Sequence, residues 1–489
     1  MNYLLALASA VLLILIFPRF EYTFLAPVAL TPILIACARE QRWTRRFLQG
    51  WAAGFVFWFG VCYWIQFVLE VHGGMGRWGG WGTFALFALL KGLHMALFAA
   101  LAGFLMARQS QRGWAAIPAV AALWAGLERT HGELGFTWLQ LGNAGIDMAL
   151  PMRLAPITGV YGLSFIFAMI GCAAALLILQ RPRGHLAWLI ALLALPLLPR
   201  SAPPADGTER VLVVQPNIDS EAQFTTESLA ALERNLALLS RPSNAGLIVW
   251  PEAPAPFYLE SEQFRNYIGS IARAAHAYFL LGAVGRAQDG APLNSGVMVS
   301  PDGSIIGRYD KMYLVPFGEF VPSVFGWVNR ITHEAGDFEP GHRVVDFPVD
   351  GHNPPQTIGA FICYESAFPD LVRQFTHDGA NLLVNLSNDG YFGTSAAREQ
   401  HLKLVRMRAA ENRRWILRAT NDGITALVDP SGQVVQRVPI LEQISATMRV
   451  GFEYGLTPYV RFGDWFAWSC LIVGVATALL SAFKPAGTD

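Results

Sequence analysis

The sequence predicts a membrane α-helical bundle of about eight transmembrane helices joined to an α/β domain, and three observations support this. Of 489 residues, 53% are apolar and only 15% are charged, well below the roughly 25% charged residues of soluble domains. The apolar residues concentrate in 1–199 and return at 465–483. Between them, residues 205–450 have the composition of a soluble domain and alternate strand-like with helix-like patterns.

Eight apolar stretches provide the predicted membrane helices, since a helix of about 20 residues crosses a bilayer. They are Tyr3–Phe17, Phe24–Ala38, Gly50–Leu69, Trp81–Ala107, Trp114–Glu128, Ile157–Leu179, Leu186–Leu198 and Trp465–Phe483. The first, second, fifth and seventh are short, so each could instead be a re-entrant or interfacial segment. The first stretch lacks a preceding basic region, so we do not expect a cleaved signal peptide.

Arginines in the connecting segments predict the orientation of the bundle. Those that follow the second, fourth and sixth stretches are Arg39, Arg42, Arg45, Arg46, Arg108, Arg112, Arg181 and Arg183. Basic loops stay on the cytoplasmic side, so seven spans place the following domain on the outer side. The expected domains are therefore a bundle at 1–200, an outer domain at 205–450 and a C-terminal transmembrane helix within 460–489.

Charge, cysteine content and missing motifs exclude several classes of protein. The 36 basic residues balance 36 acidic residues, so the overall charge gives no sign of nucleic-acid binding. Five cysteines in 489 residues are too few for a fold stapled by disulfides. The sequence contains no CxxC, HExxH or P-loop pattern, so we expect neither a metal nor a nucleotide cofactor.

Within 205–450, short apolar runs predict buried strands, and amphipathic runs between them predict helices. The strands are expected at 210–215, 247–250, 278–283, 357–363, 381–386 and 416–419, and the helices at 221–240, 261–276 and 396–413. Turn signals between strand pairs occur at Pro301-Asp302-Gly303 and Pro430-Ser431-Gly432. This alternation predicts layered sheets with helices outside.

Three short segments that end or follow these strands carry reactive side chains. They are LIVWPEAPAPF with Glu252, GRYDKMYLVPFGEFVP with Lys311 and Glu319, and GAFICYESAFP with Cys363 and Glu365. A thiol attacks only as the thiolate, a carboxylate can remove its proton, and an ammonium can stabilise a developing oxyanion. Taken singly, each residue is more often structural, because a lone strand cysteine is usually a core residue.

In this order and spacing, the segments WPE, YDKxxLVPFGE and CYE resemble the nitrilase superfamily, and LVPFGEFVP is typical of its apolipoprotein N-acyltransferase family. NLSNDGYFG, QHLKLVRMRAAENRR, LRATNDGITALVDPSG and GLTPYVRFGDW fit the same family. The resemblance covers nearly the whole chain, and the motif series agrees with an independent membrane layout. One departure is Gly390-Tyr391, where the family often has Ala-Trp, and it affects only the fine shape of the pocket.

The resemblance implies a bacterial inner-membrane enzyme with eight spans and a periplasmic nitrilase-like domain, an α-β-β-α sandwich. It implies ping-pong transfer of an acyl chain, through a cysteine thioester and without a cofactor. The donor is a phospholipid, and the acceptor is the α-amino group of the diacylglyceryl-cysteine of an apolipoprotein. The matching catalytic residues are Glu252 as the base, Lys311 as the oxyanion stabiliser and Cys363 as the nucleophile.

The resemblance also implies supporting residues. Glu319 matches an additional carboxylate of the family, and Tyr364 and Glu365 match the two residues after the nucleophile. Cys363 is the only cysteine between residues 173 and 469. An unpaired thiol in an oxidising compartment risks oxidation, so its presence there is better explained by chemistry than by packing.

Access to the site is predicted from the apolar segment Phe320–Gly341. It contains Phe325 and Trp327, and we expect either a membrane-facing arm that admits acyl chains to Cys363 or an ordinary buried loop. Tyr391 is expected to pack near the site. These three aromatic side chains are the predicted access residues.

Two other functions use the same sequence features. A membrane-tethered amidase or nitrilase-type hydrolase would transfer the acyl group to water, but it needs no bundle of many spans. A transporter or scaffold with a non-catalytic outer domain would have lost residues of the triad, and none is lost. Lys91 and His94 lie one turn apart in the fourth stretch. One interpretation is a lipid-headgroup or proton site. The other, which we favour because the spans show no acidic partner, is an interior polar pair or a lysine that snorkels to the interface.

Overall fold

The structure is a computed structural model that describes residues 1–112, 114–133, 135–200, 207–219, 222–241, 244–316, 318–320 and 338–483. The chain divides into two compact units. The helical unit comprises Met1–Gln66, Trp81–Arg200 and Phe462–Asp489. The sheet unit comprises Phe67–Gly80 and Ser201–Arg461.

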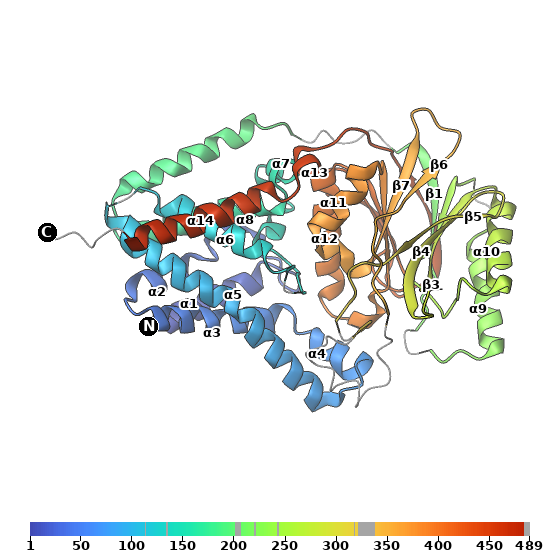
Figure 1. Cartoon of the computed structure of the whole chain (residues 1–489), viewed down its shortest axis with the longest axis horizontal. Helices are drawn as coiled ribbons and strands as arrows, with labels where there is room; N and C mark the ends of the chain where they lie inside the picture. Colours follow the sequence, from blue (N-terminus) through green and yellow to red (C-terminus); the bar gives the residue numbers. More distant parts are fainter. Residues whose placement is uncertain are drawn as a thin grey trace. The chain divides into compact units, whose positions relative to one another are not determined.

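The helical unit consists of α-helices joined by short 3₁₀ helices (Figure 1). The α-helices are α1 Asn2–Leu15, α2 Thr31–Arg39, α3 Trp43–Val61, most of α5 Gly76–Arg112, α6 Ala116–Arg129, α7 Ala155–Thr158, α8 Val160–Ile178 and α14 Trp465–Phe483. The 3₁₀ helices are η1 Thr23–Val28, η3 Leu141–Gly145, η4 Pro151–Leu154 and η5 Arg183–Leu197. These segments are mostly apolar, which explains why they pack together in one unit.

Helix length supports fewer membrane spans than the eight predicted. Among the described residues, three helices are long and apolar enough to cross a membrane, namely Gly76–Arg108, Val160–Ile178 and Trp465–Phe483. A bent pair, Trp43–Val61 with Trp64–His72, would make a fourth. The other four predicted stretches give shorter helices: α1 with 14 residues, η1 with 6 followed by α2 with 9, α6 with 14, and the 3₁₀ helix η5 with 15. Pro27 lies in η1, and proline restricts an α-helix there.

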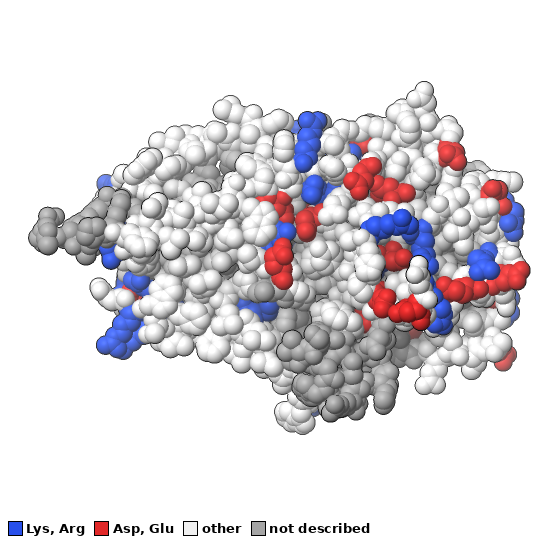
Figure 2. Space-filling model, in the orientation of Figure 1, with Lys and Arg blue, Asp and Glu red and all other residues white. Residues whose placement is uncertain are grey.

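The surface of the helical unit is suited to lipid. Few charged side chains are visible on its face, whereas they gather over the sheet unit (Figure 2). On α14, Ile472, Leu480 and Phe483 are 68%, 67% and 83% exposed. A long helix with exposed apolar side chains on one side and a buried seam on the other is stable in a bilayer and costly in water.

Small residues let α6 and α14 approach closely within the helical unit. A Cβ on Gly126 of α6 would lie 2.5 Å from the Cα of Leu471, and one on Gly474 would lie 2.9 Å from the Cα of Leu123. Arg129, near the end of α6, forms a buried ion pair with Asp464 at the start of α14. Close backbone packing supported by a polar pair is a usual way for apolar helices to associate.

The sheet unit contains, in its described residues, two six-stranded sheets. The first has the order β12-β1-β2-β3-β4-β5, with β1 Glu209–Gln215, β2 Leu247–Val249, β3 Tyr278–Arg286, β4 Pro292–Val299, β5 Ile305–Asp310 and β12 Ile444–Val450. The second has the order β11-β10-β9-β8-β7-β6, with β6 Asp346–Val349, β7 Gln356–Ile362, β8 Leu382–Ser387, β9 Ile416–Thr420, β10 Ala426–Val428 and β11 Val434–Arg437. Strands β1–β3 and β7–β9 are parallel.

Helices cover the outer face of each sheet (Figure 1). They are α9 Thr226–Leu239 and α10 Glu262–Ala275 on the first sheet, and α11 Pro369–Asp378 and α12 Ala397–Asn412 on the second. The observed arrangement is therefore the α-β-β-α sandwich that the resemblance implies. The six predicted strands and three predicted helices are present, and the two predicted turns join β4 to β5 and β10 to β11.

The sequence prediction missed α11, β6 and β12. Helix α11 has 10 residues and β6 has 4, which is too short for a clear periodic pattern. Strand β12 has exposed and half-buried residues along most of its length, so it lacks the apolar run that indicates a buried strand. Its pairing with β1 is a long-range contact that local sequence does not encode.

One segment from the predicted bundle belongs to the sheet unit. The expected single span Gly50–Leu69 is interrupted at Cys62, and the short α4 Ile65–Phe67 leads into the π-helix η2 Val68–His72. The ring of His72 lies 4.5 Å from that of Tyr391, which belongs to the 3₁₀ helix η9 Asp389–Phe392. Part of the N-terminal sequence therefore packs beside a loop of the sandwich.

Candidate active site

The candidate site lies where strand ends of the two sheets meet. Glu252 follows β2 and Lys311 follows β5, both of the first sheet, while Cys363 follows β7 of the second. Strands β4 and β7 of the two sheets pack against each other. Strand ends present side chains without breaking the ladder, so reactive groups collect there in layered α/β folds.

The centre of the site is an ammonium held between two carboxylates. Lys311 Nζ lies 3.1 Å from Oε1 of Glu252 and 2.9 Å from the Glu319 carboxylate, and Lys311 is only 1% exposed. The backbone N–H of Asn388 donates to Oε2 of Glu252 at 2.8 Å. The cluster has one positive and two negative charges, so one carboxylate can accept a proton without leaving Lys311 unpaired.

Asn294 is a member of the site that the sequence analysis missed. Its Nδ2 donates to Glu252 at 2.8 Å and to Glu319 at 2.7 Å. It lies in β4, where nearly all residues are buried. A buried amide must find hydrogen-bond partners, so a polar residue within an otherwise buried strand was the available signal.

A glycine holds the Glu252 loop in place. The N–H of Gly282 in β3 donates to the carbonyl of Pro251 at 3.1 Å. A Cβ at this position would lie 2.4 Å from the nitrogen of Ala253 and 2.5 Å from the Pro251 oxygen. Only glycine allows the loop to lie this close to the strand, so Gly282 fixes the height of Glu252 above the sheet.

Cys363 occupies a strained backbone conformation. Its φ is +50°, a left-handed value that non-glycine residues seldom adopt and that costs on the order of 1–3 kcal/mol. The residue is 6% exposed and begins the 3₁₀ helix η8 Cys363–Ala367. A sharp turn between a strand and a helix presents the side chain at the tip, which suits a nucleophile.

Glu365 joins the Cys363 turn to the Lys311 loop. One oxygen accepts from the hydroxyl of Tyr309 at 2.6 Å and from the N–H of Met312 at 2.7 Å, and the other accepts from the N–H of Ile362 at 2.7 Å. Burial raises the pKa of Glu365 to about 7, although these hydrogen bonds oppose the shift. Glu365 therefore positions both segments.

Burial and neighbouring charges set the protonation of the site. Burial disfavours the charge on Lys311, but Glu252 and Glu319 outweigh it and raise the pKa of the ammonium well above its usual range. Burial and the charge of Glu252 raise the pKa of the Cys363 thiol, and Lys311 opposes them. The resting site therefore contains a protonated Lys311 and a neutral thiol that needs a base.

We expect this raised pKa to govern the alkylation of Cys363. In the detergent-purified protein, the iodoacetamide reaction at Cys363 should rise about tenfold per pH unit from pH 7 to 9, because only the thiolate reacts. Peptide mass spectrometry separates Cys363 from the four other cysteines. A rate that levels off below pH 8 would mean that the thiol ionises readily and would contradict this electrostatic description.

The remaining predicted site residues are Tyr364, Tyr391, Phe325 and Trp327. Tyr364 is buried, with its ring 5.1 Å from that of Phe368. Tyr391 is 40% exposed and lies three residues after Asn388, which binds Glu252. Phe325 and Trp327 fall outside the described residues.

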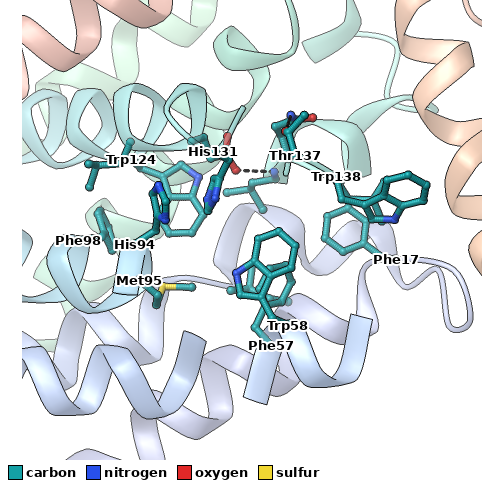
Figure 3. A pocket seen from close by; sticks show the side chains of 16 residues that line it. Phe17, Phe57, Trp58, His94, Met95, Phe98, Trp124, His131, Thr137 and Trp138 are labelled. Carbon is teal, nitrogen blue, oxygen red and sulfur yellow. Dashed lines mark hydrogen bonds between the residues drawn. The ribbon is translucent and has the colours of Figure 1, made fainter. Parts of the chain in front are cut away.

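A separate cavity of about 40 Å³ lies within the helical unit, and Figure 3 shows its lining. His94 stacks on His131 at 3.9 Å between ring centroids, and its Nε2 lies 3.2 Å from the hydroxyl of Thr130. Lys91 Nζ donates to the carbonyl of Phe136 at 2.8 Å. Both residues thus have interior polar partners, as the structural alternative predicts.

A buried carboxylate also lines this cavity. Glu128, at the end of the fifth predicted stretch, lines the same cavity as His94. One of its oxygens accepts from the N–H of Leu141 at 2.6 Å, so this carboxylate anchors a loop inside the unit. The cavity is too small for an acyl chain and has room for only a few water molecules.

The comparisons with known proteins agree with the fold and the motifs. The carbon-nitrogen hydrolase family matches residues 210–449, and the apolipoprotein N-acyltransferase N-terminal domain matches residues 9–173. An apolipoprotein N-acyltransferase of Geobacter metallireducens is 33% identical over 99% of this chain and 95% of its own. One of Azotobacter vinelandii is 34% identical over 98% of this chain and 93% of its own. A solved amidase from Nesterenkonia sp. AN1 is 16% identical, with a TM-score of 0.40, and covers 54% of this chain and 96% of its own.

The sheet unit has two facing sheets with Glu252, Lys311 and Cys363 at strand ends, and it is a carbon-nitrogen hydrolase domain. The same chain contains apolar helices long enough to cross a membrane. These two relatives, which match nearly the whole of this chain at more than 30% identity, are both apolipoprotein N-acyltransferases. The chain belongs to the apolipoprotein N-acyltransferase family. It is therefore a bacterial membrane protein and an acyltransferase.

Proposed function

We propose that this chain transfers an acyl chain from a glycerophospholipid, through a thioester on Cys363, to the α-amino group of the diacylglyceryl-cysteine of an apolipoprotein. This is the last step of lipoprotein maturation. The observation that carries the proposal is the buried Lys311 between Glu252 and Glu319, beside the strained Cys363. The chain that holds this cluster is similar over nearly its full length to apolipoprotein N-acyltransferases.

In the first half-reaction, Glu252 takes the proton of Cys363, and the sulfur attacks the ester carbonyl of the phospholipid. The ammonium of Lys311 has three N–H groups and directs two of them to carboxylates, which leaves one for the oxyanion. Collapse breaks the carbon–oxygen bond, and Glu252 returns its proton to the departing lysophospholipid alkoxide. The product is the Cys363 thioester.

In the second half-reaction, the α-amine of the apolipoprotein attacks the thioester carbonyl. Glu252 accepts a proton from the amine, the carbon–sulfur bond breaks, and Cys363 recovers a proton. An amide is more stable than a thioester, so the step is downhill and needs no cofactor. Glu319 keeps Lys311 in place throughout, because it holds the ammonium while Glu252 exchanges protons.

We place the catalytic domain, residues 205–450, on the periplasmic side of the bacterial inner membrane. The support is the arginine-rich loops at Arg39–Arg46 and Arg181–Arg183, which stay cytoplasmic. Eight spans, including short ones, with the bundle at 1–200 and a last helix within 460–489, fit this orientation. Phe325, Trp327 and Tyr391 are the proposed access residues for acyl chains.

An experiment that compares acyl transfer to an amine with acyl transfer to water tests the function. The full chain in detergent is incubated with phospholipid and a synthetic diacylglyceryl-cysteine lipopeptide, and a lipopeptide with an acetylated α-amine serves as the matched control. We expect N-acylated peptide and lysophospholipid in equal amounts, and no acylation of the control. Free fatty acid in place of the amide would identify a hydrolase, and neither product from folded protein would overturn the proposal.

A further inference from the structure

We propose that His401, held by Asp389 and Arg418, is a positioning residue that fixes the backbone of Cys363 for attack. The inference rests on the proposed function, because it assigns a role to a side chain that contacts the backbone of the proposed nucleophile. None of the three side chains is exposed to solvent, and they come from α12, from η9 and from β9.

His401 reaches directly to the strained turn. Its Nε2 lies 2.9 Å from the carbonyl oxygen of Cys363, whose φ is +50°. A carbonyl only accepts, so Nε2 must carry the hydrogen and donate it. A hydrogen bond on this peptide opposes relaxation of the turn toward a common conformation, which would move Sγ away from the tip.

Arg418, which is paired with Asp389, holds the other side of the ring. His401 Nδ1 lies 3.0 Å from Oδ1 of Asp389 and 3.1 Å from Nη2 of Arg418. The same Nη2 lies 2.7 Å from both oxygens of Asp389. The carboxylate and the guanidinium therefore neutralise each other in a fully buried position, where an unpaired charge would be costly.

The charges favour a neutral imidazole. Burial raises the pKa of Asp389, but Arg418 outweighs it and holds that pKa well below its usual range. Burial and Arg418 lower the pKa of His401, although Asp389 opposes them. A neutral ring with its hydrogen on Nε2 donates to Cys363 and accepts from Arg418 through Nδ1. This Nδ1 has no hydrogen to give to the carboxylate, so Asp389 holds the ring through Arg418. The role of His401 is therefore geometric and includes no proton transfer.

The same loop also holds the base. Asn388, the residue before Asp389, donates its N–H to Glu252 at 2.8 Å. A Cβ on Gly423 would lie 2.3 Å from the carboxylate of Asp389, so this glycine makes room for the charge. The loop 388–389 thus sets the position of Glu252 directly and that of Cys363 through His401.

Paired variants of His401 test the proposal in the full chain in detergent. His401→Met keeps the volume and removes the donor, whereas His401→Gln keeps an N–H near the Nε2 position. We expect His401→Met to lower kcat for acyl transfer about 100-fold, the effect of a displacement of about 1 Å, with KM for phospholipid unchanged. His401→Gln should recover about tenfold of that loss, and His377→Met, on the exposed end of α11, should match the wild type.

Two further measurements keep the outcomes distinct. The alkylation rate of Cys363 should differ between His401→Met and the wild type but not between His401→Gln and the wild type. If the wild type never forms an acyl-enzyme at Cys363, the proposed function is refuted. The alkylation rates alone would then test whether His401 positions Cys363. Equal alkylation in all three, or a His401→Gln enzyme as slow as His401→Met, overturns the inference.

If its melting temperature shows that His401→Met folds poorly, a second variant tests the proposal. Asp389→Asn keeps the shape of the side chain but withdraws the charge that anchors Arg418 and His401. We expect it to lower kcat about tenfold at unchanged KM. Wild-type kcat in the folded Asp389→Asn enzyme would overturn the inference.

Discussion

Replacement of Cys363 by alanine is expected to abolish the acyl-enzyme while the protein stays folded. The substitution removes one sulfur atom from a residue that is 6% exposed, and it leaves the hydrogen bond from His401 to the backbone carbonyl intact. Without a nucleophile, the thioester cannot form. We therefore expect acyl transfer to fall on the order of 10⁴-fold or more.

The measurement is the intact mass of the detergent-purified protein after incubation with phospholipid alone. The wild type should gain the mass of one acyl chain on the Cys363 peptide and lose it when a diacylated lipopeptide is added. Cys363→Ala should show no gain. Cys172→Ala removes another buried thiol, in α8, and should acylate like the wild type.

Full acyl transfer by folded Cys363→Ala would contradict the assignment of the nucleophile. It would also favour a scaffold or transporter, for which the substitution should be harmless. Cys363→Ser adds a finer comparison, since a hydroxyl is a far weaker nucleophile than a thiolate at neutral pH. We expect a slow or absent ester adduct from that variant.

Lys311→Met is expected to have the second largest effect, on both activity and stability. The side chain is 1% exposed and lies between the carboxylates of Glu252 and Glu319. Its removal leaves two buried negative groups without their counter-charge, which costs about 3–5 kcal/mol. Loss of the oxyanion stabiliser should lower kcat by a further 10²–10³-fold or so.

A double variant separates these two effects. Lys311→Met combined with Glu319→Gln removes one positive and one negative charge, so the net charge of the cluster returns to that of the wild type. We expect the melting temperature to recover most of the loss, while acylation of Cys363 stays as low as in Lys311→Met. Recovery of acylation together with stability would mean that Lys311 is only structural.

The sequence by itself predicted the proposed catalytic trio and most of the secondary structure around it. Glu252 and Cys363 each follow a strand whose apolar run is visible in the sequence, and Lys311 follows a strand that the turn Pro301-Asp302-Gly303 indicates. Strand ends of layered sheets present side chains at a common edge. The layered α/β fold follows from the same local periodicity. These features depend on a few neighbouring residues, which is why a pattern can predict them.

Tertiary structure alone decided how the trio is held. Asn294 bonds to Glu252 across 42 positions of sequence, Lys311 to Glu252 across 59, and His401 to Cys363 across 38. The break at Cys62 and the packing of His72 on Tyr391 also lie outside any local pattern. Sequence periodicity records which face of an element is buried, but register and packing choose the atoms that meet there.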